Sequence, residues 1–241
     1  MGGFSQFSYR AWEVLLKYII DDVTSRGEIM DDSYEKSKLI QNFSKETLNS
    51  IEEIGRSAAE RAASFVEDMS GDKIEIKVFK VGLVTPKDIK ERMGNDTKVF
   101  TKIKFDGIIN GTGVLVFSED SALKLSDAML AGMGMDDESD DGEKFSEMKI
   151  SAINETCNLL ISAYVDTFAN FMKTSLNMHP PSFVIGCGKE LIDEIFKSYD
   201  VKDDDLVFTF ESELFSHGIG AGFEVLIVIH HDSITTLFNE L

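Results

Sequence analysis

Cysteine, basic side chains and long apolar runs are all scarce in this chain of 241 residues. The two cysteines, Cys157 and Cys187, do not have the spacing of a metal motif, and two thiols do not make a disulfide framework. They fit a reducing compartment, so we expect a cytoplasmic protein. The most apolar run near the N-terminus, AWEVLLKYII, contains Glu13 and Lys17 and is too short to span a bilayer. Membrane insertion is therefore not expected.

Positive charge is in the minority. The sequence has 24 Lys and Arg against 43 Asp and Glu, which gives a formal net charge of −19 at pH 7. Such a polyanion repels phosphate backbones and anionic lipid headgroups, so we expect no nucleic acid or membrane surface as a partner. A protein with a basic patch fits better. Hydrophobic residues still make up 43% of the chain, which is a globular composition.

The apolar patterning predicts one order of elements that occurs twice. From about residue 46 it comprises a long helix, a strand, a short helix opened by Thr85-Pro86, a hairpin of two strands, and a closing helix capped by Asp120 or Ser121. The order starts again near residue 149, with a long helix that we expect to reach Leu176. We therefore predict an α+β fold. Two pseudo-symmetric repeats share a mainly antiparallel sheet flanked by long helices.

The predicted organisation has four parts. They are an N-terminal helical extension (1–45), the first repeat (46–135), an acidic linker (136–148) and the second repeat (149–241). Part of the linker resembles a calcium loop, with matches at loop positions one, three, five and six by Asp137, Ser139, Asp141 and Gly142. Position twelve would be Met148, where a bidentate glutamate is needed. A solvated linker is the favoured interpretation, and calcium binding is left as an alternative.

Three polar residues stand out on the long helix of the second repeat. Ser151, Glu155 and Asn158 are spaced by four and three residues, so they fall within about 60° of arc on one face. The opposite face is apolar and belongs in the core: Ile153, Cys157, Leu160, Ile161, Tyr164 and Phe168. An exposed polar face is a normal feature of an amphipathic helix. The spacing alone leaves open whether these residues form a site.

The segment SAINETCNLLISAYVDTFANFMKTSLNMHPPSF resembles the signature of the CheC family of bacterial chemotaxis phosphatases, a group that includes CheX and FliY. The signature is Asp or Ser, three residues, Glu, two residues, Asn, twenty-two residues and Pro. Every fixed position is matched, by Ser151, Glu155, Asn158 and Pro181. The resemblance extends from about residue 47 to residue 241 and does not cover the N-terminal segment.

The resemblance implies a hydrolase that removes phosphate from the aspartyl-phosphate of a CheY-like response regulator in two-component signalling. Glu155 would pair with a lysine of the regulator, and Asn158 would orient the attacking water. Ser151 and Pro181 would have supporting roles. The resemblance implies no cofactor or metal of the chain's own, because Mg²⁺ would be held by the phosphorylated regulator. A CheD-like deamidase is a further partner that it suggests.

The first repeat departs from the signature. Asn49 and Glu53 stand at its first two fixed positions, but Arg56 replaces the asparagine. Arginine only donates hydrogen bonds, so it cannot place a water as an amide does. We therefore expect one working site, in the second repeat. The four histidines form no Ser-His-Asp or Cys-His arrangement that the sequence reveals.

A second functional class remains open. A non-catalytic module, similar to FliM or to a CheD-binding protein, would use the same fold to dock a receiver domain or a flagellar switch component. Under that alternative Ser151, Glu155 and Asn158 form a contact patch without chemistry. The presence of both Glu155 and Asn158 favours the enzyme, because docking alone does not require the asparagine.

Overall fold

The structure is a computed structural model that describes residues 45–135, 144–203, 205, 207–230 and 233. The chain divides into a unit of residues 1–48 and a unit of residues 49–241, and the fold described here is that of the second unit. Apart from Lys45 and Ser233, the predicted N-terminal extension and the predicted last helix of the second repeat lie outside the described residues, and so do the candidate calcium residues 137–142. The side chains of residues 45–49, 78 and 79 are not described either.

The described elements follow the predicted order. The helices are α3 (Lys45–Ser70), α4 (Pro86–Met93), α5 (Glu119–Gly132), α6 (Glu147–Phe171) and α7 (Gly188–Lys197). The strands are β1 (Ile74–Val84), β2 (Thr97–Gly107), β3 (Gly111–Phe117), β4 (Leu176–Met178), β5 (Ser182–Cys187), β6 (Val207–Ser216) and β7 (Ala221–Ile229). A long helix, a strand, a short helix and two further strands occur in each half. The second half adds β4, which the sequence analysis did not predict.

The start of α4 was predicted correctly and the start of α5 was not. Thr85 and Asp88 form a capping box, in which each residue's side chain accepts a hydrogen bond from the other's backbone N–H. The predicted α5 caps, Asp120 and Ser121, are wrong. The cap is Ser118, whose hydroxyl accepts a hydrogen bond from the Ser121 N–H at 3.1 Å. Ser118 has the extended backbone of a cap, and the acidic residues after it suit the positive end of the helix.

The predicted end of the second long helix was also wrong. Helix α6 ends at Phe171 rather than at Leu176. Lys173 has a left-handed backbone with φ of 52°, and the Thr174 N–H donates to the Ala169 carbonyl at 2.9 Å. This turn stops the helix and redirects the chain. Leu176 then enters β4, where it pairs with Gly107 of β2.

The sheet confirms the predicted pseudo-symmetry. Among the described residues seven strands form one sheet in the order β1-β6-β7-β3-β2-β4, and β5 also pairs with β2. Every pairing is antiparallel. Exchanging β1 with β5, β2 with β6 and β3 with β7 reverses the order β1-β6-β7-β3-β2-β5 and so reproduces it. The two halves meet where β3 pairs with β7, with Val114 opposite Leu226.

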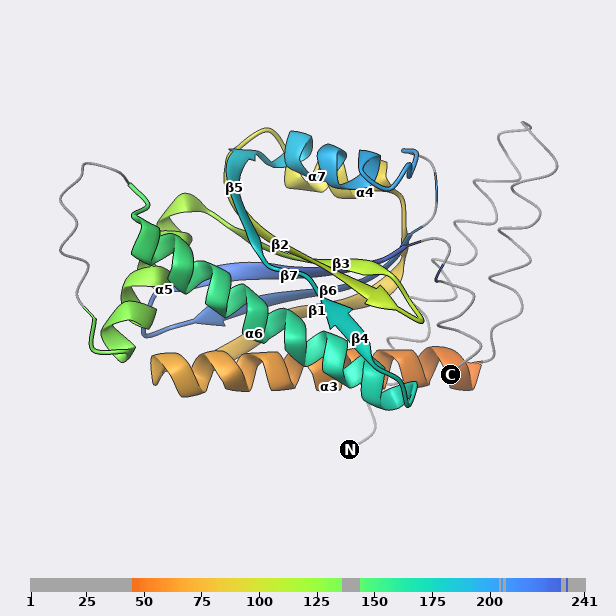
Figure 1. Cartoon of the computed structure of the whole chain (residues 1–241), viewed down its shortest axis with the longest axis horizontal. Coiled ribbons are helices and arrows are strands. Elements are labelled where there is room, and N and C mark those ends of the chain that lie inside the picture. Colours follow the sequence, from red (N-terminus) through yellow and green to blue (C-terminus); the bar gives the residue numbers. More distant parts are fainter. Residues whose placement is uncertain (1–44, 136–143, 204, 206, 231–232, 234–241) are drawn as a thin grey trace. The chain divides into compact units, whose positions relative to one another are not determined.

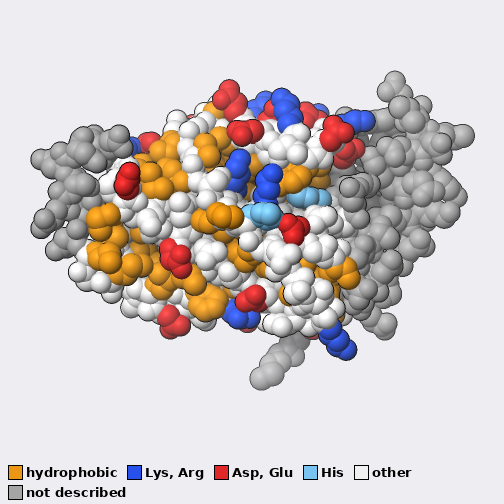
Figure 2. Space-filling view, viewed as in Figure 1, with side chains coloured by type: hydrophobic (Ala, Val, Ile, Leu, Met, Phe, Trp, Pro, Cys, Tyr) orange, Lys and Arg blue, Asp and Glu red, His pale blue; other side chains and the backbone are white. Residues whose placement is uncertain are grey.

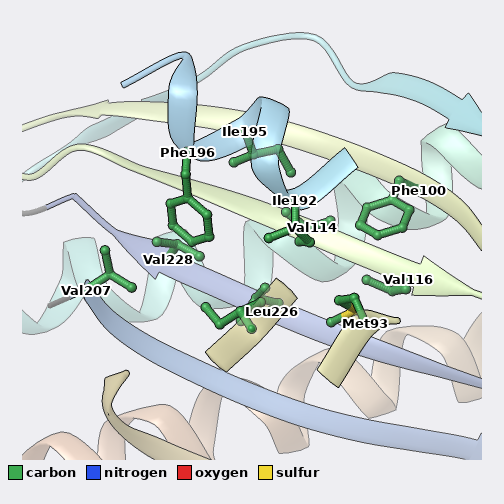
Figure 3. Packing of buried hydrophobic residues seen from close by; sticks show 11 residues of the cluster. Met93, Phe100, Val114, Val116, Ile192, Ile195, Phe196, Val207, Leu226 and Val228 are labelled. Carbon is green, nitrogen blue, oxygen red and sulfur yellow. The ribbon is translucent and has the colours of Figure 1, made fainter. Parts of the chain in front are cut away.

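Helices cover both faces of the sheet (Figure 1). On one face α4 and α7, the equivalent short helices, pack over an apolar cluster. Figure 3 shows Phe196 of α7 pointing towards Val228 of β7, and Ile192 of α7 lying beside Val114 of β3. The opposite face carries α6 and the part of α3 that belongs to this unit. Burial of apolar surface on both faces is the main force that holds the layers together.

Helix α6 lies close to the centre of the sheet. All six residues predicted for its core face are buried: Ile153, Cys157, Leu160, Ile161, Tyr164 and Phe168. Gly113 of β3 allows the approach, because a Cβ atom at this position would lie 2.6 Å from Ile161 side-chain atoms. The close packing fixes which face of α6 is turned away from the sheet.

Candidate active site

The start of α6 is fixed by a cap. The hydroxyl of Ser146 accepts a hydrogen bond from the Lys149 N–H at 3.2 Å, and Ser146 itself is buried. Farther along, Cys157 packs against β2, where its thiol lies 3.5 Å from the Thr101 carbonyl oxygen. Burial raises the pKa of this thiol, so Cys157 is a packing residue rather than a nucleophile.

The predicted polar residues lie on the exposed side of α6. Ser151 and Glu155 are exposed, and Asn158 is half-buried. Within the described part of the chain, no hydrogen bond or ion pair engages the side chains of these three residues. Their polar atoms are therefore available to a ligand, and Asn158 is held more firmly than the other two because its surroundings partly enclose it.

An open groove of about 600 Å³ runs along this face of α6. The helix wall carries the three polar residues, and the opposite wall is the connection from β4 to β5. The lining residues are Glu147, Ile150, Ser151, Asn154, Glu155 and Asn158 on the helix, and Met178, His179, Pro180 and Pro181 on the connection. The structure thus brings Pro181, which follows Asn158 by 23 residues, to the same groove as Ser151, Glu155 and Asn158. The two walls are in contact beside the groove, where the Ser162 hydroxyl, which donates to the Asn158 carbonyl at 2.6 Å, lies 3.4 Å from the Met178 sulfur.

Asn154 is a groove residue that the sequence analysis missed. It lies one turn before Asn158, and its side-chain oxygen is buried without a hydrogen-bond partner among the described residues. A buried amide oxygen is costly to leave unpaired, so this atom favours a water or ligand donor at the groove. The sequence could have indicated this residue, because its spacing of four from Asn158 places both side chains on the same side of the helix.

The second missed feature is a pair of residues on the strand wall. The Nε2 atom of His179 lies 2.5 Å from Oδ2 of Asp106 in β2, and the Asn177 amide donates to Oδ1 of the same carboxylate at 3.2 Å. The hydrogen bond with His179 is the main cause that lowers the pKa of Asp106. The two residues are 73 positions apart, so only the pairing of β4 with β2 reveals the contact.

The equivalent face in the first half is different. Glu53 and Arg56 are exposed on α3, while the side chain of Asn49 is not described. Arg56 pairs with Glu52, with Nη2 and Oε1 3.2 Å apart. Glu52 and Arg56 therefore stand where the second half has Asn154 and Asn158, and their ion pair engages the Arg56 guanidinium.

Two features are absent from the residues that the structure describes. These residues contain no group of three or more His, Cys, Asp or Glu side chains placed to hold a metal ion. No helix in the same residues is both long and apolar enough to cross a membrane.

The fold and the groove can be compared with known proteins. No model of a known protein family matches the chain. The chain is 21% identical over 167 residues to CheC1 of Halobacterium salinarum, described as a candidate CheY-P phosphatase. The match covers 69% of this chain and 82% of CheC1.

Two solved structures share the fold. FliY of Thermotoga maritima has a TM-score of 0.60 and 20% identity, over 83% of this chain and 97% of FliY. The middle domain of FliM from H. pylori has a TM-score of 0.60 and 15% identity, over 83% of this chain and 100% of that domain. These similarities confirm the resemblance to the chemotaxis proteins CheC and FliY. The chain has the α+β fold that this group shares with FliM.

Proposed function

We propose that this protein is a phosphatase that hydrolyses the aspartyl-phosphate of a CheY-like receiver domain. The observation that carries the proposal is the groove. Its helix wall holds Glu155 and Asn158, whose side chains have no hydrogen-bond or ion-pair partner among the described residues, and Pro181 lies on the facing wall. The similarity to CheC1, described as a candidate CheY-P phosphatase, supports the same reaction.

The proposed reaction requires only a modest acceleration by the enzyme. An acyl phosphate is already labile, and a hundredfold acceleration requires only about 2.7 kcal/mol of transition-state stabilisation. Positioning one water in line with the phosphorus atom can supply that amount. The amide of Asn158 suits this role, because it can accept a hydrogen bond from the water and donate one to a phosphoryl oxygen. No nucleophile from this chain is needed.

Glu155 has a separate role in the proposal. Its exposed carboxylate would form an ion pair with a lysine of the receiver and so bring Asn158 to the phosphoryl group. Ser151, one turn earlier on the same face, would contact the partner, and Pro181 would shape the facing wall. We expect Mg²⁺ to be held by the receiver domain, as the family resemblance implies.

The deciding experiment measures loss of phosphate from a Mg²⁺-bound, phosphorylated receiver domain, with and without the protein. We expect wild type to accelerate the loss and Asn158→Ala not to. Arg56→Ala is the matched control, because it truncates the equivalent position of α3, and it is expected to keep full activity. Equal acceleration by wild type and Asn158→Ala would exclude Asn158 from the site.

A second function is favoured by one observation, the TM-score of 0.60 with FliM. In that case the protein docks a receiver, a flagellar switch component or a CheD-like deamidase without hydrolysis. Binding of a phosphorylated receiver without accelerated phosphate loss, across the receivers of the source organism, would support the docking function and reject the enzyme.

A further inference from the structure

The strand wall of the groove carries a histidine that the proposed reaction does not yet use. His179 lines the same groove as Glu155 and Asn158, and about half of its side chain, 52%, is exposed. Its main-chain N–H donates to the Lys104 carbonyl at 2.9 Å, which fixes its backbone on β2. The sheet therefore holds His179 at the edge of the groove, where its exposed imidazole lies against Asp106.

Asp106 determines which ring atom remains for a ligand. A carboxylate can only accept, so the Nε2 atom of His179 carries the proton in the 2.5 Å contact with Asp106. The pKa of Asp106 is lowered, so this carboxylate is ionised at neutral pH. The Nδ1 atom is left for an incoming group. It donates a hydrogen bond when the ring is protonated and accepts one when the ring is neutral.

The pseudo-symmetry connects this pair with the site. Glu53 and Lys77 are separated along the chain by the same number of residues as Glu155 and His179. Lys77 has no carboxylate partner of this kind, and its ammonium lies 3.8 Å from the centre of the Phe215 ring. The register agrees, because Phe215 opposes Glu75 as Asp106 opposes Asn177. Among the described residues, the His–Asp pair thus occurs at this position only in the half that retains the asparagine.

Charged side chains near His179 lie on β2 and on α6. Asp106 contacts it from β2, and Glu147 and Glu155 line the groove on α6. On β2, Lys104 places its ammonium 4.8 Å from the centre of the Tyr199 ring, and Lys102 pairs with Glu194 of α7 at 3.7 Å. Figure 2 shows Lys or Arg side chains beside a His near the middle of this face, with an Asp or Glu side chain against the same His. On a chain with a net charge of −19, such a group suits an anionic ligand.

We propose that His179, oriented by Asp106, contacts the substrate, and that its protonated Nδ1 donates a hydrogen bond to an anionic oxygen of the phosphorylated receiver. This inference rests on the proposed function, because Glu155 and Asn158 hold the receiver in the groove. The oxygen belongs either to the phosphoryl group or to a carboxylate beside it. Asp106 acts as a positioning residue, since it touches the imidazole and not the substrate.

The test compares His179→Gln with wild type in binding of a receiver domain, phosphorylated and unphosphorylated, between pH 6 and pH 8. We expect wild type to bind the phosphorylated receiver roughly tenfold more tightly at pH 6 than His179→Gln does, the usual worth of one hydrogen bond to a charged group. This advantage should be absent when the ring is neutral, because the single N–H of a neutral imidazole is already donated to Asp106. Asp106→Asn should weaken binding in the same direction while the histidine remains.

His217→Gln is the matched control. His217 is also exposed and also holds a carboxylate, with Nε2 2.8 Å from Oε2 of Glu75, but it lies beside β1 at the opposite edge of the sheet. Its replacement should change neither affinity nor pH dependence. A pH effect limited to the phosphorylated receiver identifies the phosphoryl oxygen, whereas an equal effect on both forms identifies a receiver carboxylate.

The outcomes separate this inference from the proposed function. If Asn158→Ala removes turnover and His179→Gln shows the wild-type affinity and pH profile, the inference is overturned and the phosphatase stands. If no receiver domain binds at any pH, both are overturned. If His179→Gln loses the pH-dependent affinity without any catalysed turnover in wild type, the contact is supported and the docking function replaces the enzyme.

Discussion

The hydroxyl oxygens of Tyr164 and Ser212 lie 2.7 Å apart in the core, where they join α6 to β6. Both residues are buried, and burial raises the pKa of the Tyr164 phenol. Tyr164→Phe leaves the Ser212 hydroxyl unpaired, and we expect a loss of about 1–3 kcal/mol in the free energy of unfolding. The double variant Tyr164→Phe/Ser212→Ala should lie closer to wild type. Urea unfolding of wild type, Tyr164→Phe, Ser212→Ala and the double variant measures the coupling, and additive losses would contradict it.

The close approach of α6 to β3 yields a second prediction. In Gly113→Ala the new methyl group would meet Ile161 at 2.6 Å, which is too short for a carbon contact. We expect overpacking to cost about 1–3 kcal/mol. Gly113→Ala/Ile161→Val should recover part of the loss, because the valine lacks one of the crowded atoms. Thermal unfolding of the three proteins tests this, and no recovery in the double variant would show that the cost arises elsewhere.

A third prediction concerns Lys90, a buried lysine that joins α4 to α7. Its ammonium lies 2.8 Å from an Asp193 carboxylate oxygen and 2.5 Å from one of Asp203. Hydrogen bonds from Lys197 and Lys90 lower the pKa of Asp193, and those to Asp193 and Asp203 raise the pKa of Lys90. These ion pairs therefore stabilise the folded protein fully at pH values between 3.8, the ordinary pKa of an aspartate, and 10.5, the ordinary pKa of a lysine. This stabilisation is lost as the pH falls through the lowered pKa or rises through the raised one.

Lys90→Met should accordingly lower the urea midpoint at pH 7. The difference from wild type should shrink as the pH falls below 3.8, where the Asp193 carboxylate becomes protonated. Lys197→Met removes the exposed partner of Asp193 and is the control with a smaller effect. A difference between Lys90→Met and wild type that does not change with pH would show that packing, and not the ion pairs, is responsible.

The fourth prediction distinguishes the amide of Asn158 from its shape. Asn158→Asp keeps the size of the side chain but replaces the donor with a carboxylate that repels a phosphoryl group. We expect phosphatase activity to fall about a hundredfold or more, the whole rate gain assigned to this residue. Asn170→Asp adds the same charge to an exposed position near the end of α6 and should leave activity unchanged. Retained activity in Asn158→Asp would mean that the amide does not position the water.

Local patterns predicted much of the fold and half of the groove. The 3.6-residue period of α6 separated its core face from Ser151, Glu155 and Asn158, because that separation depends only on the helix itself. The period could not show where α6 ends. The end depends on the left-handed backbone of Lys173 and on the pairing of Leu176 with Gly107, which form only in the folded sheet. The contact of His179 with Asp106 could not be predicted for the same reason, because only the pairing of β4 with β2 brings the two side chains together.

The strand order has a consequence for how the two halves depend on each other. Strand β1 hydrogen-bonds only to β6 of the other half within the described sheet, and β5 only to β2. A polypeptide with one half alone would therefore leave its first strand unpaired, because the two strands that separate it from its own hairpin belong to the other half. It could complete the sheet only by exchanging that strand with a second copy. The single chain thus has the topology of a strand-swapped homodimer whose two subunits have been joined. Because the halves are joined in one chain, their sequences can differ, and the groove on α6 has an asparagine where the equivalent face of α3 has Arg56.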